Sequence, residues 1–168
     1  VHIICVPTPI FKEGSKSAPD LSYVYDAVKS LAPHLKEDDL LIIESTISVG
    51  TSDEVRLILE RLGIEKGKIH IAHCPERVIP GNIMEELVNN DRVVGGLTDE
   101  ATNLAVEFYE SFVTGKVIKT SARTAELCKL SENSFRFSDS PPKRGLSPLL
   151  RSNAKKLCCE LCNVDLIE

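Results

Sequence analysis

The stretch Leu40-Leu41-Ile42-Ile43-Glu44-Ser45 decides the fold class of this chain. Its apolar residues run without alternation, which is typical of a strand buried on both faces of a parallel sheet. A short loop, 46–50, leads into a segment with helical spacing, which Thr51 or Ser52 is expected to cap and Gly63 to end. The inner face of that helix is expected to consist of Val55, Ile58, Leu59 and Leu62. This strand–loop–helix unit predicts an α/β fold.

The same kind of unit recurs on both sides of this stretch. Continuous apolar runs predict further strands at 2–6, 69–74, 92–96 and 115–120. Amphipathic spacing predicts further helices at 21–32, 99–113 and 121–135. The segment 10–19, which contains glycine, serine and proline, is expected to be a loop. Because strands alternate with helices, the connections should cross over and form a parallel sheet with helices on both sides.

Bulk composition excludes several classes of protein. The chain has 168 residues, of which 42% are hydrophobic and 27% charged, and this suits one globular domain. A net charge of -5 argues against a nucleic-acid-binding protein. No apolar run approaches the roughly 20 residues that span a bilayer. Three of the six cysteines lie singly in apolar segments, as core residues do, which predicts a reducing, cytoplasmic setting.

Polar residues directly follow three of the predicted strands. Ligands of parallel sheets bind beyond the carboxyl ends of the strands. The expected binding crevice is therefore marked by Pro7-Thr8-Pro9, Ser45-Thr46 and Pro75-Glu76-Arg77. Glu76 could act there as a base or order a water molecule, or it could form a surface ion pair with Arg77 or a nearby lysine. Thr46 could hold a water molecule or a ligand oxygen, or cap the helix that follows.

Lys129, Asn133 and Arg136 share one face of the helix predicted from Ser121. Two cations and an amide on one face suit the binding of a polar, anionic ligand, and they equally suit an exposed charged face. Ser121 or Thr124 is expected to cap this helix. Its core side is expected to consist of Leu127, Leu130 and Phe135.

Neither the cysteines nor the histidines predict a metal site. Cys159 and Cys162 form a C-x-x-C pair without a second pair of ligands nearby. His70 and His73 are three apart in a predicted strand and should point to opposite faces. The G-x-G-x-x-G loop of dinucleotide-binding sheets is absent, which argues either against NAD or for further sequence upstream of Val1.

Six motifs follow one another in the order and at the spacing of a known family. They are C-V-P-T-P at 5–9, P-D-L-S-Y-V at 19–24, E-S-T-I-S-V-G-T at 44–51, C-P-E-R-V-I-P-G at 74–81, N-D-R-V-V-G-G at 90–96 and R-T-A-E-L-C-K-L-S-E-N-S-F-R at 123–136. Together they resemble the UDP-glucose/GDP-mannose dehydrogenase family over residues 1–136. The fourth and fifth motifs resemble the branch that acts on UDP-N-acetylhexosamines, UDP-N-acetyl-D-mannosamine above all.

The resemblance implies a partial Rossmann-like sheet with flanking helices, followed by the start of a central helical region. Residues 1–120 would be the C-terminal half of an NAD-binding domain, residues 121–136 the start of the central helix, and residues 137–168 a divergent linker and tail. It also implies NAD as the cofactor, a UDP-N-acetylhexosamine as the substrate and a homodimeric parent protein. The charge and the apolar runs described above add the expectation of no nucleic-acid or membrane partner.

The resemblance further implies a role for each matching site residue. Thr8 and Thr46 match positions that contact NAD, and Glu76 matches an acidic residue that helps to activate water, with Thr46 beside it. Lys129 matches the catalytic lysine. The positions that match substrate-binding residues are Arg77, Val78, Asn133 and Arg136.

The sequence also departs from the family pattern. The glycine-rich loop and the catalytic cysteine motif of the family are absent, so we expect a piece of a dehydrogenase that is inactive alone. One alternative is a non-catalytic product that binds a UDP-sugar or associates with a partner. Another is a relative of the 3-hydroxyacid dehydrogenases, which have a lysine and an asparagine spaced like Lys129 and Asn133.

Overall fold

A five-stranded sheet forms the centre of the protein, in the order β1-β4-β5-β6-β7. The computed structural model describes residues 1–13, 16–76 and 83–139. The strands are β1 (His2–Ile4), β4 (Leu40–Ile43), β5 (His70–His73), β6 (Arg92–Gly96) and β7 (Val117–Ser121). All four residues of β4 are buried, as its unbroken apolar run predicts. The predicted α/β class with a partial Rossmann-like sheet is confirmed.

The sheet is mixed, so the prediction of a wholly parallel sheet was wrong. β1, β4 and β5 are parallel to one another, whereas β6 runs antiparallel to β5, with Ala72 opposite Gly96 and His73 opposite Gly95. β7 is parallel to β6. The helix between β5 and β6, α3 (Ile83–Asn89), has 7 residues, which is about 10 Å of rise. It does not return the chain to the other end of β5, and β6 therefore starts near the carboxyl end of β5.

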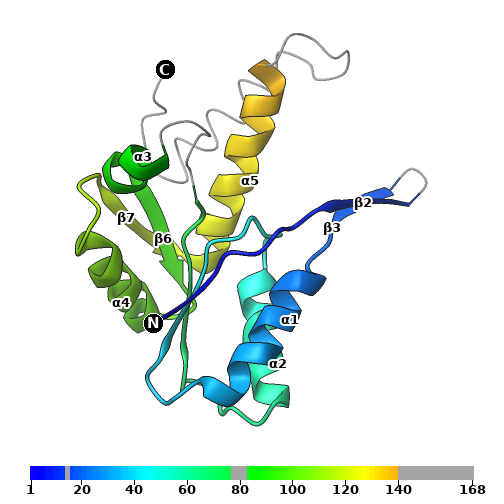
Figure 1. The fold of residues 1–168 in the computed structure, drawn as a ribbon, viewed down its shortest axis with the longest axis vertical. Helices are drawn as coiled ribbons and strands as arrows, with labels where there is room; N and C mark the ends of the chain where they lie inside the picture. Colours follow the sequence, from blue (N-terminus) through cyan, green and yellow to red (C-terminus); the bar gives the residue numbers. More distant parts are fainter. Residues whose placement is uncertain (14–15, 77–82, 140–168) are drawn as a thin grey trace.

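Helices cover both faces of the sheet (Figure 1). α1 (Ser22–Leu31) and α2 (Thr51–Arg61) pack on one face, and α4 (Asp99–Glu110) packs on the other. A short 3-10 helix, η1 (Ala32–His34), follows α1. Each face of the sheet carries a hydrophobic core, and alternate residues of β4 belong to each. Leu41 and Ile43 face α1 and α2, whereas Leu40 and Ile42 face α4. No helix within the described ranges is both long and apolar enough to cross a membrane.

Residues 10–13 and 16–19 form the two strands of a β-hairpin, so the loop predicted over 10–19 was wrong for these residues. β2 (Ile10–Glu13) and β3 (Lys16–Pro19) pair antiparallel, and Figure 1 shows them projecting from the body of the molecule. Pro19 occupies the last position of its strand, where a missing N–H group is tolerated. Ile10 and Phe11 are exposed, because a two-stranded hairpin that projects from the body has no layer to cover them.

The last helix, α5 (Ala122–Asp139), continues three residues beyond the Arg136 boundary expected from the sequence. The Ser121 hydroxyl accepts a hydrogen bond from the Thr124 amide (3.2 Å), as predicted for its cap. Residues 137–168 were predicted to be a divergent linker and tail. The first three of them belong to α5, and the rest lie outside the described residues.

Gly95 determines where α5 begins. A Cβ atom at this position would lie 2.2 Å from the Ser121 carbonyl oxygen and 2.8 Å from the Ala122 amide nitrogen. Only a residue without a side chain therefore lets the first residues of α5 lie directly on β6. From this starting point α5 contacts β5, β6 and β7 on the sheet face opposite α4.

Candidate active site at the strand ends

A cavity of about 300 Å³ lies beyond the carboxyl ends of β1 and β4. We call it the strand-end cavity, and it is lined by Cys5, Val6, Pro7, Thr8, Glu44, Ser45, Thr46 and Glu76. The structure thus brings Thr8, Thr46 and Glu76 together, although they follow three different strands. The rule that ligands bind at the carboxyl ends of parallel strands had indicated these positions.

Ser45 ties the ends of the first two strands together. Its hydroxyl accepts a hydrogen bond from the Val6 amide (2.8 Å) and donates to the Val6 carbonyl (2.8 Å). The amides of Glu44 and Ser45 both donate to the Ile4 carbonyl. These bonds extend the pairing of β1 with β4 beyond the strands, and they place Pro7 and Thr8 beside Thr46.

The Glu44 carboxylate forms the polar floor of the cavity. The Tyr109 hydroxyl donates to its Oε1 atom (2.5 Å) and the Cys5 thiol donates to its Oε2 atom (3.2 Å). Desolvation and the adjacent Glu44 carboxylate raise the pKa of Cys5 to about 12, so Cys5 remains a thiol. Burial, the neighbouring Cys74 and Glu44 likewise raise the pKa of Tyr109. Sequence reasoning missed Glu44, although the strand-end rule would have found it one residue before Ser45.

Lys129 connects α5 to this cavity. Its side chain is buried, and its Nζ atom donates a hydrogen bond to the Glu76 carbonyl oxygen. The alternative of an exposed charged face is therefore wrong for Lys129. Glu76 is half-buried at the cavity, and its alternative, an ion pair with Arg77, stays a prediction because Arg77 lies outside the described residues. Asn133 follows one turn later and is half-buried.

The inward face of α5 is more polar than its sequence predicts. Glu126, Lys129 and Glu132 are buried at intervals of three residues, whereas Leu127 and Leu130 are only half-buried. The prediction that the two leucines form the core side was therefore wrong. The reason is that this face of α5 meets backbone donors and acceptors as well as apolar side chains. Arg77 and Val78, like the side chains of Phe135 and Arg136, lie outside the described residues.

The N-terminus of α2 is capped by Glu126 rather than by a neighbouring residue. The Glu126 carboxylate accepts hydrogen bonds from the Gly50 amide (2.6 Å), the Ser52 amide (2.9 Å) and the Ser52 hydroxyl (2.7 Å). The Thr51 hydroxyl instead donates to the Ser48 carbonyl (2.7 Å). The prediction of Thr51 or Ser52 as the cap was wrong, because a carboxylate from α5 occupies that place.

His73 is a neutral buried group beside Lys129. Burial and the charge of Lys129 lower its pKa to about 4, against the opposing effect of its hydrogen bond to Ile43. Its Nδ1 atom lies 2.7 Å from the Ile43 carbonyl oxygen, which requires Nδ1 to carry the proton. The Nε2 atom has no hydrogen-bond partner among the described residues. Sequence reasoning had considered this residue only as a metal ligand.

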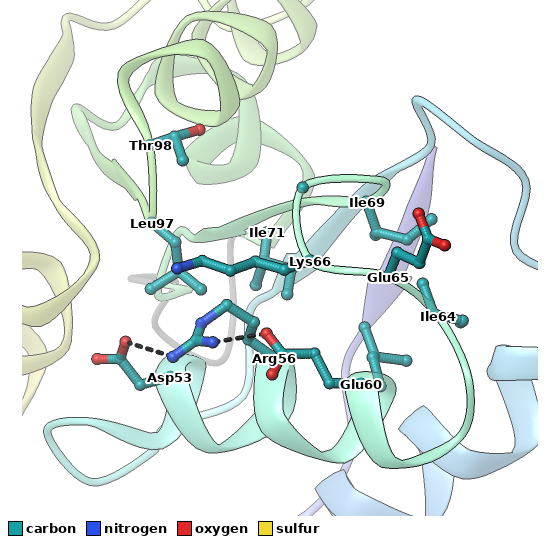
Figure 2. Close-up of a pocket in the computed structure, with 12 residues that line it drawn as sticks. Asp53, Arg56, Glu60, Ile64, Glu65, Lys66, Ile69, Ile71, Leu97 and Thr98 are labelled. Atoms are coloured by element: carbon teal, nitrogen blue, oxygen red, sulfur yellow. Dashed lines mark hydrogen bonds and ion pairs between the residues drawn. The ribbon is translucent and has the colours of Figure 1, made fainter.

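A second cavity, of about 270 Å³, lies at the other end of β5. We call it the α2 cavity, and Figure 2 shows its lining residues, including Asp53, Arg56, Glu60, Lys66 and Leu97. The Arg56 guanidinium lies between two carboxylates, 2.6 Å from Glu60 Oε1 and 3.8 Å from Asp53 Oδ1. None of the site residues predicted from the sequence lines this cavity.

Comparison with known proteins identifies the family. Residues 1–113 match the family model described as "UDP-glucose/GDP-mannose dehydrogenase family, NAD binding domain". The chain belongs to this family. The matched segment covers β1 to α4 and therefore contains the whole strand-end cavity.

Individual relatives carry more specific names. A UDP-N-acetyl-D-mannosamine dehydrogenase of Methanocaldococcus jannaschii is 50% identical over 136 residues, which are 81% of this chain and 31% of the relative. An NDP-N-acetyl-D-galactosaminuronic acid dehydrogenase of Ralstonia solanacearum is 45% identical over 144 residues, 80% of this chain and 33% of the relative. The solved structure of a UDP-D-ManNAc dehydrogenase from Pyrococcus horikoshii matches with a TM-score of 0.74 at 47% identity, covering 80% of this chain and 32% of that one. The chain thus spans about a third of these relatives' length.

The strand-end cavity fits one part of an NAD molecule. Its described lining offers hydroxyls from Thr8 and Thr46 and carboxylates from Glu44 and Glu76, but no cation. Hydroxyls and carboxylates suit the ribose hydroxyls and the positively charged nicotinamide ring, whereas they would repel a pyrophosphate. The residues therefore fit the nicotinamide–ribose end of the cofactor.

Proposed function

We propose that this chain forms one side of the active site of an NAD-dependent dehydrogenase that oxidises a UDP-N-acetylhexosamine, in the first place UDP-N-acetyl-D-mannosamine, to its uronic acid. The observation that carries the proposal is the contact of Lys129 with the Glu76 carbonyl, at the rim of the cavity that holds Thr8 and Thr46. The name of the Methanocaldococcus jannaschii relative supports UDP-N-acetyl-D-mannosamine as the substrate, and the name of the Ralstonia solanacearum relative supports the wider class of N-acetylated sugars.

Each residue near the cavity has a distinct task in this proposal. NAD, when bound, supplies the hydride acceptor, and the hydroxyls of Thr8 and Thr46 bind it. The Lys129 ammonium stabilises the negative charge that develops on the substrate oxygen; its contact with the Glu76 carbonyl at the cavity rim supports this role. Glu76 and Thr46 hold the water molecule that hydrolyses the thioester left after the second hydride transfer, and each of the two transfers reduces one NAD molecule. The substrate itself would be bound by Arg77, Val78, Asn133 and Arg136.

A nucleophilic thiol is missing from the described part of this site. Oxidation of an alcohol to an acid in two steps is commonly assisted by a cysteine that captures the intermediate aldehyde. Cys5 lines the cavity, but its raised pKa keeps it protonated. Cys74 and Cys128 are buried, and burial raises the pKa of Cys74 to about 12. We therefore propose that the nucleophile comes from outside the described residues, and we expect the 168-residue chain to form no NADH by itself.

A chimeric enzyme tests this proposal. Residues 1–136 would replace the matching segment of the Methanocaldococcus jannaschii dehydrogenase, and NADH formation would be followed at 340 nm. We expect turnover with UDP-N-acetyl-D-mannosamine and much less with UDP-glucose. A chimera that folds and binds NAD but oxidises no UDP-sugar would contradict the proposal. Clear NADH formation by the 168-residue chain alone would contradict the expected need for an outside nucleophile.

A further inference from the structure

Glu126 is a fully buried carboxylate whose hydrogen bonds leave its own helix. A buried charge is costly unless hydrogen bonds satisfy it. Here both carboxylate oxygens are satisfied by α2, since Oε2 accepts from the Gly50 amide and Oε1 accepts from the Ser52 amide and hydroxyl. All these bonds span more than 70 residues of sequence. They therefore hold together two elements that the chain itself does not join.

The N-terminus of α2 needs an outside acceptor because no local side chain supplies one. Its N-cap residue is Gly50, which has a φ of 96° and makes no side-chain cap. The free amides at the start of a helix require an acceptor, and their partial positive charge favours an anion. Glu126 meets both needs, and it does so from α5.

The same carboxylate lies between the two halves of the candidate site. Gly50 ends the loop that begins at Thr46, and Lys129 follows Glu126 by three residues on the same side of α5. Thr46 lines the strand-end cavity, and Lys129 contacts Glu76 at its rim. One fully buried group thus connects the loop that carries Thr46 to the helix that carries Lys129.

We propose that Glu126 is a positioning residue that holds Thr46 and Lys129 in a fixed relation across the strand-end cavity. The proposal rests on the proposed function for the roles of Thr46 and Lys129, whereas the coupling between the two segments can be measured without it. If Glu126 only stabilised the start of α2, its substitution would change the NMR signals of Gly50 and Ser52 alone. If Glu126 is a positioning residue, its substitution must also change the signals of Thr46 and Lys129.

The test is an NMR comparison of variants in the full 168-residue chain. Glu126→Gln keeps the size of the side chain but places an amide donor against the donors of Gly50 and Ser52. We expect hydrogen exchange at these two amides to become about tenfold faster, with shifts in the Thr46 amide and the Lys129 side-chain resonances. Glu126→Asp keeps the charge and should restore part of both effects. Glu110→Gln on α4 removes an exposed carboxylate of the same kind and should change neither.

A milder variant keeps the test decisive if Glu126→Gln does not fold. Ser52→Ala removes one of the hydrogen bonds and leaves both backbone bonds, so it should cause smaller changes of the same sign at Gly50, Thr46 and Lys129. Unchanged exchange at Gly50 in Ser52→Ala and Glu126→Gln would overturn the proposal. So would faster exchange at Gly50 with unchanged Thr46 and Lys129 resonances.

Addition of NADH to the same samples separates this inference from the proposed function. If wild-type resonances of Thr8 and Thr46 shift with NADH and the Glu126→Gln variant binds more weakly, both proposals are supported. If NADH causes no shift in the wild-type chain but Glu126→Gln still disturbs Thr46 and Lys129, the positioning role stands, and NADH binding to the chimeric enzyme then decides the cofactor assignment.

Discussion

The two cavities at the two ends of β5 are similar in volume but differ in how their charges are satisfied. In the strand-end cavity the polar side chains come from segments that follow three different strands, and Lys129 of α5 reaches its rim. In the α2 cavity Asp53, Arg56 and Glu60 lie on one helix, and Arg56 pairs with both carboxylates (Figure 2). Asp53 also pairs with Arg123 of α5 (3.0 Å). Size alone therefore does not mark a site. What sets the strand-end cavity apart is that its hydroxyls and carboxylates follow the carboxyl ends of neighbouring parallel strands.

The largest expected effect is a loss of catalytic rate when the lysine at the strand-end cavity is replaced, but not when a lysine at the α2 cavity is replaced. In the chimeric enzyme, Lys129→Ala should lower kcat by about 100- to 1000-fold, because it removes the cation proposed to stabilise charge on the substrate oxygen. Lys66→Ala, at the exposed rim of the α2 cavity, is the matched control and should stay within about twofold of wild type. Equal losses in both variants would abolish the distinction between the cavities.

The next largest effect is expected on the stability of the protein in acid, through His73, which lies beside Lys129. The folded-state pKa of His73 is about 4, below the ordinary value of 6.5, so between these pH values the unfolded chain binds a proton that the folded chain does not. The free energy of unfolding should therefore fall by up to about 3 kcal/mol as the pH drops from 6.5 to 4. Urea titrations of wild type and His73→Leu across this range should show a flatter pH dependence for the variant. His34→Leu, at an exposed histidine, should keep the wild-type slope.

A smaller effect is expected for the floor of the strand-end cavity. Tyr109→Phe removes the hydroxyl that donates to Glu44, and it should lower the free energy of unfolding by about 2 kcal/mol, as is usual for a buried hydrogen bond to a charged group. Tyr23→Phe serves as the control because Tyr23 is exposed. A stability loss no larger than that of the control would show that the hydrogen bond from Tyr109 to Glu44 does not contribute to stability.

The smallest effect is expected at the α2 cavity. Arg56→Met removes the cation between Asp53 and Glu60, whose pairs are partly exposed and therefore weak. The free energy of unfolding should change by no more than about 0.5 kcal/mol. A double-mutant cycle with Glu60→Gln measures the pair directly. A coupling energy several times larger would contradict the expectation that partial exposure makes the Arg56–Glu60 ion pair weak.

Local patterns predicted the parallel part of the fold well. The buried run 40–45 and the polar residues after it indicated β4 and its position at the cavity, because burial on both faces leaves a clear mark in a sequence. The direction of β6 left no such mark. A run of apolar residues gives the same pattern whether the strand is parallel or antiparallel to its neighbour. The pairing of β6 with β5 in the structure, for example of Gly95 with His73, shows that β6 is antiparallel.

The partners of α5 could not be predicted for a related reason. Helical periodicity placed Lys129 and Asn133 on one face but could not decide whether that face was buried, because polar faces are usually exposed. Glu126 is satisfied by Gly50 and Ser52, which lie far away in the sequence. No local signal shows such a contact.

Gly95 has a consequence for how this chain can vary. In a library in which every position is mutated in turn, selection for folded protein should leave Gly95 almost without tolerated replacements, since even alanine would place its methyl group against the Ser121 carbonyl. Gly63, which has open space around its Cβ position and is constrained only by its positive φ, should still accept asparagine. Such a profile would record, in the frequencies of surviving variants, how closely β6 and the start of α5 approach each other.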